Sequence, residues 1–579
     1  MADYFCAGMR LYLDKRVDWE RLLTLRSGEA VDVAAEVSAY RSILETGARL
    51  AQSFEPAGRE HWAKEAALTP DGGAQSPAHI RSAYDALCKA GLVSLSVSDA
   101  YGGFGLPALM NGVFLEMLAR ADASLMMVLG LQTGAANDIE KYGSEEIKRA
   151  ILPRFASGEV QGCMDLTEPQ AGSDLGGIQT KATELPDGRI RVDGQKIFIS
   201  NGGAEVHLVL ARDADSFEQS RGTTNGLSLV LVTRHQADGS ANGVRVARLE
   251  RKLGIHGSAT CEVVFEGALG VRLGEKGKGF RAMLDLMNHA RLGVASQSLG
   301  LAQAALHDAV EYARQRKQFG RPIAEQPLVI TMLAKMKVDI EAVRALLYRT
   351  YMLLDLNVAR EKALAAGELN EAARVELQED LEQDQTRVRL LTPLCKYMST
   401  EICDDLTRDA LQIFGGVGFT LDSNAGKLHA DSLIMTIYEG TSEIQASFAL
   451  REIGKGALGV LFDGIREELA GMASDPARAT WAKTVEEMME KANEATRLLL
   501  SNLNYALMRS KLMLEMVVDV IAATELLQQA ALEPSRLELA VAWIQRRSLE
   551  TDFRLKRIAA GVTRFDRDAQ LVKLAIAEA

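Results

Sequence analysis

The sequence has few of the residues that bind metals or form disulfides. Its 579 residues include only six cysteines and eight histidines. The histidines show no spacing typical of zinc ligands, so we expect no metal site. No Cys-x-x-Cys pair occurs, and reduced, mostly buried thiols are therefore expected, as in cytoplasmic proteins. These thiols belong to Cys6, Cys88, Cys163, Cys261, Cys395 and Cys403.

Long apolar stretches are also missing. No run approaches the roughly 18 consecutive apolar residues of a membrane-spanning helix. The first residues, Met-Ala-Asp-Tyr-Phe, show no basic region followed by an apolar one, which is the pattern of a secretory signal. The sequence therefore predicts no membrane span, no secretory signal and a cytoplasmic location.

Familiar signatures of nucleotide and nucleic-acid binding are absent too. The run Gly274-Glu-Lys-Gly277-Lys-Gly279 lacks the Gly-Lys-Ser/Thr ending of a phosphate-binding loop. Gly103-Phe-Gly105 lacks the third glycine of a dinucleotide fingerprint, and no βαβ pattern surrounds it. A net charge of −12 argues against a protein built mainly to bind nucleic acid. Rossmann and P-loop enzymes are disfavoured.

Glycine is concentrated in the middle of the chain. Residues 158–280 hold 20 of the 49 glycines, and glycine weakens helices and marks turns. Within this stretch Leu227, Leu229 and Leu231 alternate with Ser228, Val230 and Val232, and similar runs begin at Val206 and Val244. Short antiparallel strands in a compact sandwich or barrel are expected.

The flanking sequence has helical periodicity. Leu299, Ala302, Leu306, Ala309 and Ala313 recur at spacings of three and four, which predicts one face of a long helix. The charge-dense stretch at about 357–389 is typical of a solvated helical hairpin or loop. We expect a mainly α protein with a central β domain, an α–β–α architecture and an added carboxy-terminal helical bundle. The expected segments are an extension at 1–35, a helical domain at 36–157, a β domain at 158–280, a helical domain at 281–455 and the bundle at 456–579.

Four segments carry the chemistry. Taken singly, each has a plain structural account, such as a turn, a core phenylalanine or a capping box formed by Ser442 and Gln445. The segments are Cys163-Met-Asp-Leu-Thr167-Glu168-Pro169-Gln-Ala-Gly172-Ser173-Asp174, Gly194-Gln-Lys-Ile-Phe198-Ile199-Ser200-Asn201-Gly202, Arg316-Lys317-Gln318-Phe319-Gly320, and Gln412-Ile-Phe-Gly415-Gly416-Val-Gly418-Phe419 with Ile437-Tyr438-Glu439-Gly440-Thr441-Ser442-Glu443-Ile444-Gln445. Together, and in this order, they resemble the acyl-CoA dehydrogenase family over about residues 80–455.

The resemblance implies an α–β–α fold that carries FAD without a Rossmann motif. It assigns Glu439 as the catalytic base that removes the pro-α proton of an acyl-CoA while hydride leaves Cβ for flavin N5. A carboxylate suits this step because a water-poor cleft disfavours its charged form and raises its basicity. Gly440 beside the base would let the thioester approach closely.

The resemblance also assigns ligand contacts along the chain. In the family the matching residues line the flavin, hold the FAD diphosphate and adenosine, reach FAD in a neighbouring subunit, or contact the CoA. The implied cofactor residues are Met164, Leu166, Thr167, Gly172, Ser173, Phe198, Ser200, Arg316, Phe319, Gln412, Gly415, Gly416, Thr441 and Glu443. The implied substrate residues are Ser173, Asn288, Arg291 and Gly440.

The segment Lys252–Cys261, the charged insertion and the extra bundle resemble the long bacterial branch of 3-methylmercaptopropionyl-CoA dehydrogenases and related fatty acyl-CoA dehydrogenases. The implied activity is oxidation of an acyl-CoA to a trans-2-enoyl-CoA, with electrons passed to an electron-transfer flavoprotein, in a homodimer or dimer of dimers. An acyl-CoA oxidase that uses O₂ remains an alternative. A DNA-associated member of the same fold is disfavoured, because residues 451–579 hold 18 basic and 19 acidic residues. The acyl chain preference stays open.

Overall fold

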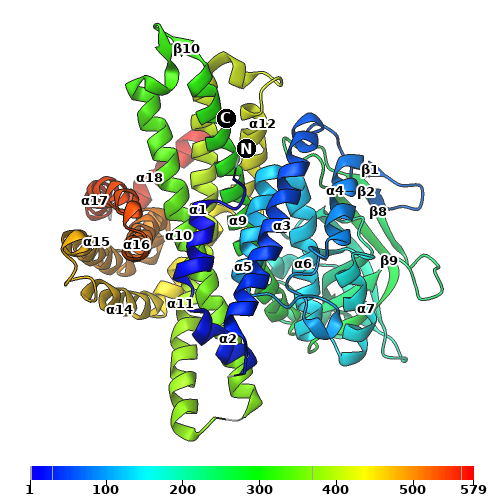
Figure 1. The fold of residues 1–579 in the computed structure, drawn as a ribbon. Coiled ribbons are helices and arrows are strands. Elements are labelled where there is room, and N and C mark those ends of the chain that lie inside the picture. Colours follow the sequence, from blue (N-terminus) through cyan, green and yellow to red (C-terminus); the bar gives the residue numbers. More distant parts are fainter. Residues whose placement is uncertain (1–2, 29, 368, 562–563, 579) are drawn as a thin grey trace. The chain divides into compact units, whose positions relative to one another are not determined.

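The computed structural model describes residues 3–28, 30–367, 369–561 and 564–578. The chain forms two compact units, each built from segments far apart in the sequence (Figure 1). The first unit comprises Met1–Phe5, Ala39–Ala309 and Thr407–Met435. The second unit comprises Cys6–Ser38, Val310–Leu406 and Thr436–Ala579.

Helices of the first unit precede and follow its strands. Side-chain caps fix the starts of the helices that begin at Ala123 and Glu145, because Asp122 accepts the N–H groups of Ser124 and Leu125 and Ser144 accepts that of Ile147. The helices are α3 (Val33–Glu60, in this unit from Ala39), α4 (Ala78–Lys89), α5 (Ala108–Ala121), α6 (Ala123–Tyr142), α7 (Glu145–Ser157), α8 (Phe217–Ser220), α9 (Gly279–Gln315, in this unit to Ala309) and α12 (Ala425–Ser432).

The glycine-rich stretch forms the predicted β domain. Strand β6 pairs with β4 and β7, and the pairings β4–β5, β5–β9 and β9–β7 complete a closed circuit, while β3 lies on β6 and β8 on β9. The strands are β3 (Gly162–Asp165), β4 (Lys181–Glu184), β5 (Ile190–Ser200), β6 (Val206–Asp213), β7 (Leu227–Thr233), β8 (Val244–Leu249) and β9 (Thr260–Leu273). A separate hairpin joins β1 (Ala67–Leu68) and β2 (Ala74–Gln75).

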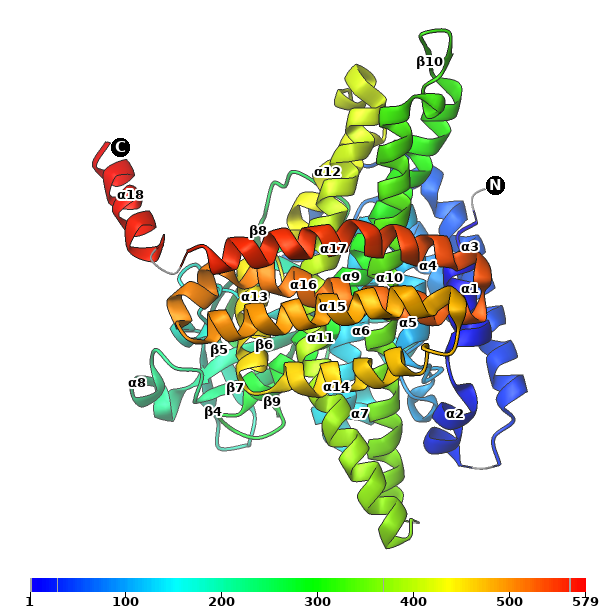
Figure 2. The same cartoon turned by 90° about the vertical axis from the view of Figure 1, so that its left-hand side faces the viewer.

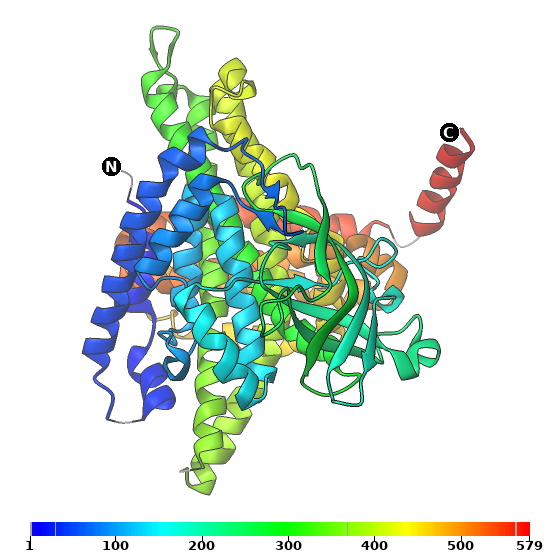
Figure 3. The same ribbon diagram turned by 90° about the vertical axis from the view of Figure 1, so that its right-hand side faces the viewer.

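Both faces of strand β7 are buried. Leu227, Leu229 and Leu231 of β7 pack in one core with residues of α6 and α7, whose helices lie against the sheet in Figure 3. Val230 and Val232 of the same strand pack in a second core formed by the opposite face. The alternation of leucine and valine along β7 thus separates two apolar cores rather than a core from solvent.

The second unit is helical apart from one small hairpin. The carboxy-terminal helices α14 to α17 run side by side in Figure 2, and Trp543 of α17 is fully buried among them. The elements are α1 (Ala7–Leu11), α2 (Trp19–Ser27), β10 (Lys317–Gln318), β11 (Arg321–Pro322), α10 (Pro327–Ala366), α11 (Glu371–Phe414, in this unit to Leu406), α13 (Ser442–Gly454), α14 (Ala457–Ala470), α15 (Pro476–Leu500), α16 (Leu503–Leu532), α17 (Leu537–Ala559) and α18 (Arg564–Glu578).

The amino-terminal segment packs into the second unit. The Tyr12 hydroxyl donates to Glu525 of α16 at 3.1 Å, and the Arg16 guanidinium forms two hydrogen bonds of 2.8 Å with the same carboxylate. Glu525 is fully buried, so its charge is compensated by these donors rather than by water.

None of the six cysteines, all of which the structure describes, forms a disulfide, and four of them are buried. No helix in the described ranges is both long enough and apolar enough to cross a bilayer.

Candidate active site

In the first unit, the predicted flavin-lining residues come from β3, the segment directly after it, and β5, which lie close together. Met164 is a buried residue of β3, and Leu166 and Thr167 follow directly after that strand. The Thr167 carbonyl accepts the N–H of Ile197 at 2.9 Å, which places the segment beside β5. The next residue, Phe198, lies in a bulge of β5 with φ 59°, and its side chain is 60% exposed. The bulge therefore turns an aromatic ring out of the sheet next to Thr167.

A buried ion pair holds this arrangement together. Lys196 Nζ lies 2.9 Å from Glu168 Oε1, and both side chains are almost completely buried. The same ammonium group donates to the carbonyls of Leu166 and Leu210 at 2.8 Å. Burial favours a higher pKa for Glu168, but Lys196 and further hydrogen-bond donors outweigh it and lower that pKa. Both residues stand in the sequence motifs, but no local pattern indicated that they meet.

Hydroxyl groups accompany the exposed ring. Ser200 ends β5 two residues after Phe198, and Gly172 and Ser173 lie exposed in the loop that leads to β4. Within the described residues, the side chains of Thr167, Ser173 and Ser200 form no hydrogen bond. They are therefore available as donors or acceptors for a bound ligand.

The predicted substrate residues on α9 contact each other. Arg291 Nη1 donates to Asn288 Oδ1 at 2.8 Å, and Arg291 is only 4% exposed. This hydrogen bond orients the Arg291 guanidinium, and contact of either residue with CoA stays a prediction.

The predicted glycine-rich segment lies at the end of α11. Gln412 belongs to the last turn of that helix, and Gly415 and Gly416 begin a short 3₁₀ turn. Gly415 has φ 61°, a value that is unfavourable for residues with a side chain. Gln412, Gly415 and Gly416 are all exposed.

The predicted base lies in the second unit, in the turn before α13. Glu439 has φ 55° and Gly440 has φ 93°, so two successive residues adopt positive φ. Gln445 Nε2 donates to the Glu439 carbonyl, and Lys396 Nζ donates to the Gly440 carbonyl, each at 2.8 Å. Thr441 caps α13 by accepting the Ile444 N–H. A non-glycine residue with positive φ costs about 1–2 kcal/mol, so these contacts hold a strained turn in place.

Space is also limited at this turn. A Cβ atom on residue 440 would lie 2.6 Å from Gln445 Nε2, so a side chain here would displace the amide that binds the Glu439 carbonyl. Burial, together with the charge of Glu439, raises the pKa of the neighbouring Tyr438 well above its usual range. The phenol beside the base therefore stays neutral at physiological pH. The Glu439 side chain itself is partly buried.

The hairpin β10–β11 carries the predicted FAD phosphate and adenosine contacts. Phe319 at its turn has φ 50° and is 93% exposed. Arg316 precedes β10, is exposed, and has no ion pair with any described residue. A free guanidinium of this kind can bind a diphosphate through two parallel hydrogen bonds.

Within each unit, the structure brings some of the predicted residues together. Thr167 lies beside the Phe198 bulge in the first unit. In the second unit Glu439, Gly440 and Thr441 form the turn that leads into α13, and Glu443 lies in the first turn of that helix. Five non-glycine residues of the described chain have positive φ, namely Phe198, Asn201, Ile255, Phe319 and Glu439. Three of the five are predicted site residues, and backbone strain of this kind is concentrated at functional sites.

One further polar cluster lies buried in the β domain. Cys163 Sγ is 3.1 Å from His207 Nδ1, and the same nitrogen is 3.0 Å from Asp165 Oδ2. Tetrahedral zinc would separate such sulfur–nitrogen and nitrogen–oxygen pairs by about 3.6 and 3.4 Å. The observed distances match hydrogen bonds instead. Burial and the Asp165 carboxylate raise the pKa of the Cys163 thiol well above its usual value, and the thiol donates a hydrogen bond to Asp165 Oδ2 at 3.4 Å.

A central β domain between helical segments, with a strained acidic turn before a helix, defines the class of the protein. Three sequence models of one family match the chain in order. The acyl-CoA dehydrogenase N-terminal domain matches residues 50–159, the middle domain 163–268 and the C-terminal domain 277–454. The chain belongs to the acyl-CoA dehydrogenase family and is an enzyme of the oxidoreductase class.

Relatives of known name support this assignment. An acyl-CoA dehydrogenase of Bacillus subtilis is 34% identical over 364 residues, which are 62% of this chain and 85% of the relative. The 3-methylmercaptopropionyl-CoA dehydrogenase of Ruegeria pomeroyi is also 34% identical, over 66% of this chain and 65% of its own length. The predicted resemblance to the family and to its long bacterial branch is thereby confirmed.

Solved structures agree. Butyryl-CoA dehydrogenase from Megasphaera elsdenii is 30% identical with a TM-score of 0.58, over 70% of this chain and 97% of that chain. A chain in the structure of the electron transferring flavoprotein of Acidaminococcus fermentans is 29% identical with a TM-score of 0.60, over 72% and 97%. An acyl-CoA dehydrogenase complexed with FAD from Bacillus anthracis reaches a TM-score of 0.73 over 94% and 91%; at 24% identity it shows the fold alone.

Proposed function

We propose that the protein is an FAD-dependent dehydrogenase that converts an acyl-CoA to its trans-2-enoyl-CoA. The observation that carries the proposal is the Glu439–Gly440 turn. It presents an acidic side chain in a strained conformation, at the position where the family resemblance implies a base. FAD, when bound, supplies the acceptor for the hydride that leaves Cβ.

The residues present fit this cofactor. The exposed Phe198 ring offers a flat apolar face, and the unpaired hydroxyls of Thr167, in the segment after β3, and of Ser200, at the end of β5, belong to the same region. Arg316 offers an unpaired guanidinium suited to the diphosphate. The Glu168–Lys196 pair holds the loop that carries Thr167, so this surface is formed before any ligand arrives.

Glu439 takes the pro-α proton in this proposal. The carbonyls on both sides of Gly440 are bound by Gln445 and Lys396, which fixes the two peptide planes that flank this residue. The backbone N–H of Glu439 is the protein donor that we expect to face the thioester oxygen as negative charge develops there. The small Gly440 leaves room for the thioester beside the base.

An electron-transfer flavoprotein is the proposed electron acceptor. Support comes from the likeness to a chain in the structure of such a flavoprotein from Acidaminococcus fermentans.

The proposed assembly is a homodimer or dimer of dimers. Support comes from large apolar side chains left exposed in both units, including Phe319, Phe419 and Leu421, which are 93, 88 and 73% exposed. Exposed apolar groups of this size mark interaction surfaces.

A substrate panel tests the proposal. Purified protein with FAD is mixed anaerobically with short, branched, thioether, aromatic and long acyl-CoAs, and flavin absorbance is followed. We expect at least one acyl-CoA to bleach the flavin, and an electron-transfer flavoprotein to restore its colour faster than O₂ does. Absence of bleaching with every class would contradict a dehydrogenase, whereas faster recovery with O₂ would point to an oxidase.

A further inference from the structure

Helix α16 of the carboxy-terminal bundle contacts α11 through four side chains spaced one turn apart on each helix. The hydroxyl of Tyr397 on α11 donates to Glu515 Oε1 on α16 at 2.9 Å. Lys511, one turn before Glu515, places its ammonium group 5.8 Å from the centre of the Tyr397 ring and 3.9 Å from Glu401 Oε1. Tyr397 and Glu401 are likewise four residues apart, so each pair lies on one helix face.

Two of these four side chains, Glu401 and Lys511, also contact the start of α13, three residues after the base. Ser442 Oγ donates to Glu401 Oε1 at 2.5 Å. Lys511 Nζ lies 2.5 Å from Glu443 Oε1, and this contact lowers the pKa of Glu443. Lys511 thus bridges Glu401 of α11 and Glu443 of α13. Glu443 belongs to the first turn of α13, and Glu401 contacts Ser442 in that turn.

Helix α11 also holds the turn itself. Lys396, which binds the Gly440 carbonyl, is the residue directly before Tyr397. One turn of α11 therefore contacts the base turn through Lys396 and the bundle through Tyr397.

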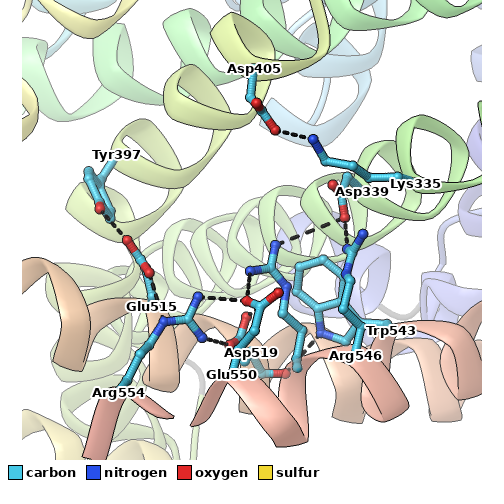
Figure 4. A network of polar contacts seen from close by, with 11 residues as sticks. Lys335, Asp339, Tyr397, Asp405, Glu515, Asp519, Trp543, Arg546, Glu550 and Arg554 are labelled. Atoms are coloured by element: carbon cyan, nitrogen blue, oxygen red, sulfur yellow. Dashed lines mark hydrogen bonds and ion pairs between the residues drawn. The ribbon is translucent and has the colours of Figure 1, made fainter. Parts of the chain in front are cut away.

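The bundle end of this contact is firmly anchored. Arg554 of α17 donates to Glu515 at 2.8 Å and to Asp519 at 2.7 Å, as Figure 4 shows. Asp519 is fully buried, and its burial raises its pKa to about 6 although Arg547 and Arg554 oppose that effect. In the same network Arg546 pairs with Asp339 of α10. A contact within the carboxy-terminal bundle therefore fixes the Glu515 side chain that accepts the hydrogen bond of Tyr397.

We propose that Lys511 and Glu515 are positioning residues for the catalytic turn, and that this is a role of the added carboxy-terminal bundle. The inference rests on the proposed function of Glu439. A strained turn persists only where its surroundings over-determine it. Contacts from α11 and α16 to residues 440, 442 and 443 supply that constraint within four residues of the base. Displacement of a reacting group by about 1 Å can cost up to about a hundredfold in rate.

Four variants test the proposal, with Lys491→Met as a matched control. Lys491 forms a similarly exposed ion pair with Asp552 at 2.5 Å between α15 and α17, away from α11 and α13. The rate of anaerobic flavin bleaching at saturating acyl-CoA is measured by rapid mixing. Lys511→Met should slow bleaching about two- to fivefold, and Tyr397→Phe about tenfold. In both variants the concentration of acyl-CoA at half-maximal rate should change less than about twofold. Lys511→Arg and the control Lys491→Met should both bleach at the wild-type rate.

Hydrogen exchange gives a second readout that needs no activity. Amides of residues 439–445 should exchange at least about threefold faster in Lys511→Met than in wild type or Lys491→Met, with no change in melting temperature. Equal rates in all variants, equal slowing by Lys491→Met, or unchanged exchange at the turn would each overturn the positioning role. If wild type bleaches with no acyl-CoA, the proposed function fails, and the exchange result still decides whether the bundle constrains the turn.

Discussion

Replacing Lys196 by methionine removes the cation from the buried pair that fixes the loop after β3. The Lys196 ammonium contacts one carboxylate at 2.9 Å and two carbonyls at 2.8 Å, and none of its side chain reaches solvent. Methionine fills a similar volume but leaves Glu168 buried without its counter-ion. Breaking a buried pair in this way costs about 3–5 kcal/mol. At roughly 2–4 °C per kcal/mol, we expect the first unit to melt at least about 5 °C lower.

Calorimetry of three variants checks this value. Lys276→Met is the matched control, because Lys276 pairs with Glu184 and Asp215 while remaining 42% exposed, and such pairs contribute about 0–1 kcal/mol. Glu168→Gln introduced into Lys196→Met should recover part of the lost stability, since it removes the uncompensated charge. The reasoning would be refuted if Lys196→Met lowered the melting temperature no more than Lys276→Met does, or if the double variant recovered none of the lost stability.

The pair also predicts a pH dependence. The pKa of Glu168 is lower in the folded protein than in the unfolded chain. Its contribution to stability is therefore present above the unfolded pKa of about 4.3 and is lost as the pH falls through the lower folded value. The difference in melting temperature between wild type and Lys196→Met should shrink on acidification below that range, and a constant difference would contradict the assignment.

Three further predictions concern other positions. Asp431 is buried with a pKa of about 7 and accepts the Ile255 N–H at 2.5 Å and the Trp62 indole N–H at 3.0 Å. The folded protein therefore keeps this carboxyl protonated at pH values where the unfolded chain loses the proton, and wild type should lose roughly 2 kcal/mol of stability between pH 5 and 7 relative to Asp431→Asn. Parallel urea midpoints for both proteins over this range would contradict this. Gly440→Ala should destabilise the base turn by about 1–2 kcal/mol or more and slow flavin bleaching, because residue 440 has φ 93° and lies against the Gln445 amide. A wild-type bleaching rate in this variant would be inconsistent with a strained turn. Phe319→Ala should change the unfolding free energy by less than about 0.5 kcal/mol but reduce the FAD retained after gel filtration; unchanged FAD content would remove this residue from the cofactor site.

The sequence predicted the architecture because its signals are local. Glycine enrichment and alternating apolar residues mark strands, and spacings of three and four mark helices. The alternation along β7 did not reveal that both faces are buried, since leucine and valine are equally apolar. The location of a second core depends on the helices that cover the sheet, and no single strand encodes that.

The candidate site was predicted in its residue types but not in its supports. Glu168 and Lys196 are 28 residues apart, and Glu443 and Lys511 are 68 apart, so only the fold brings these charges together. The positive φ of Phe198 and Glu439 also has no sequence signal, because glycine and asparagine are the usual residues there. Both features depend on tertiary contacts that impose the strain.

Glu439→Gln tests the central claim most directly. Glutamine retains the size and the backbone of the turn but cannot accept the pro-α proton, whereas Glu487→Gln on the exposed face of α15 controls for loss of an acid. Both variants are loaded with FAD and mixed anaerobically with the acyl-CoA that bleaches wild type. We predict that Glu439→Gln retains FAD and loses bleaching by roughly 10²–10⁴-fold while Glu487→Gln reacts at the wild-type rate. Undiminished bleaching by FAD-loaded Glu439→Gln would contradict the account.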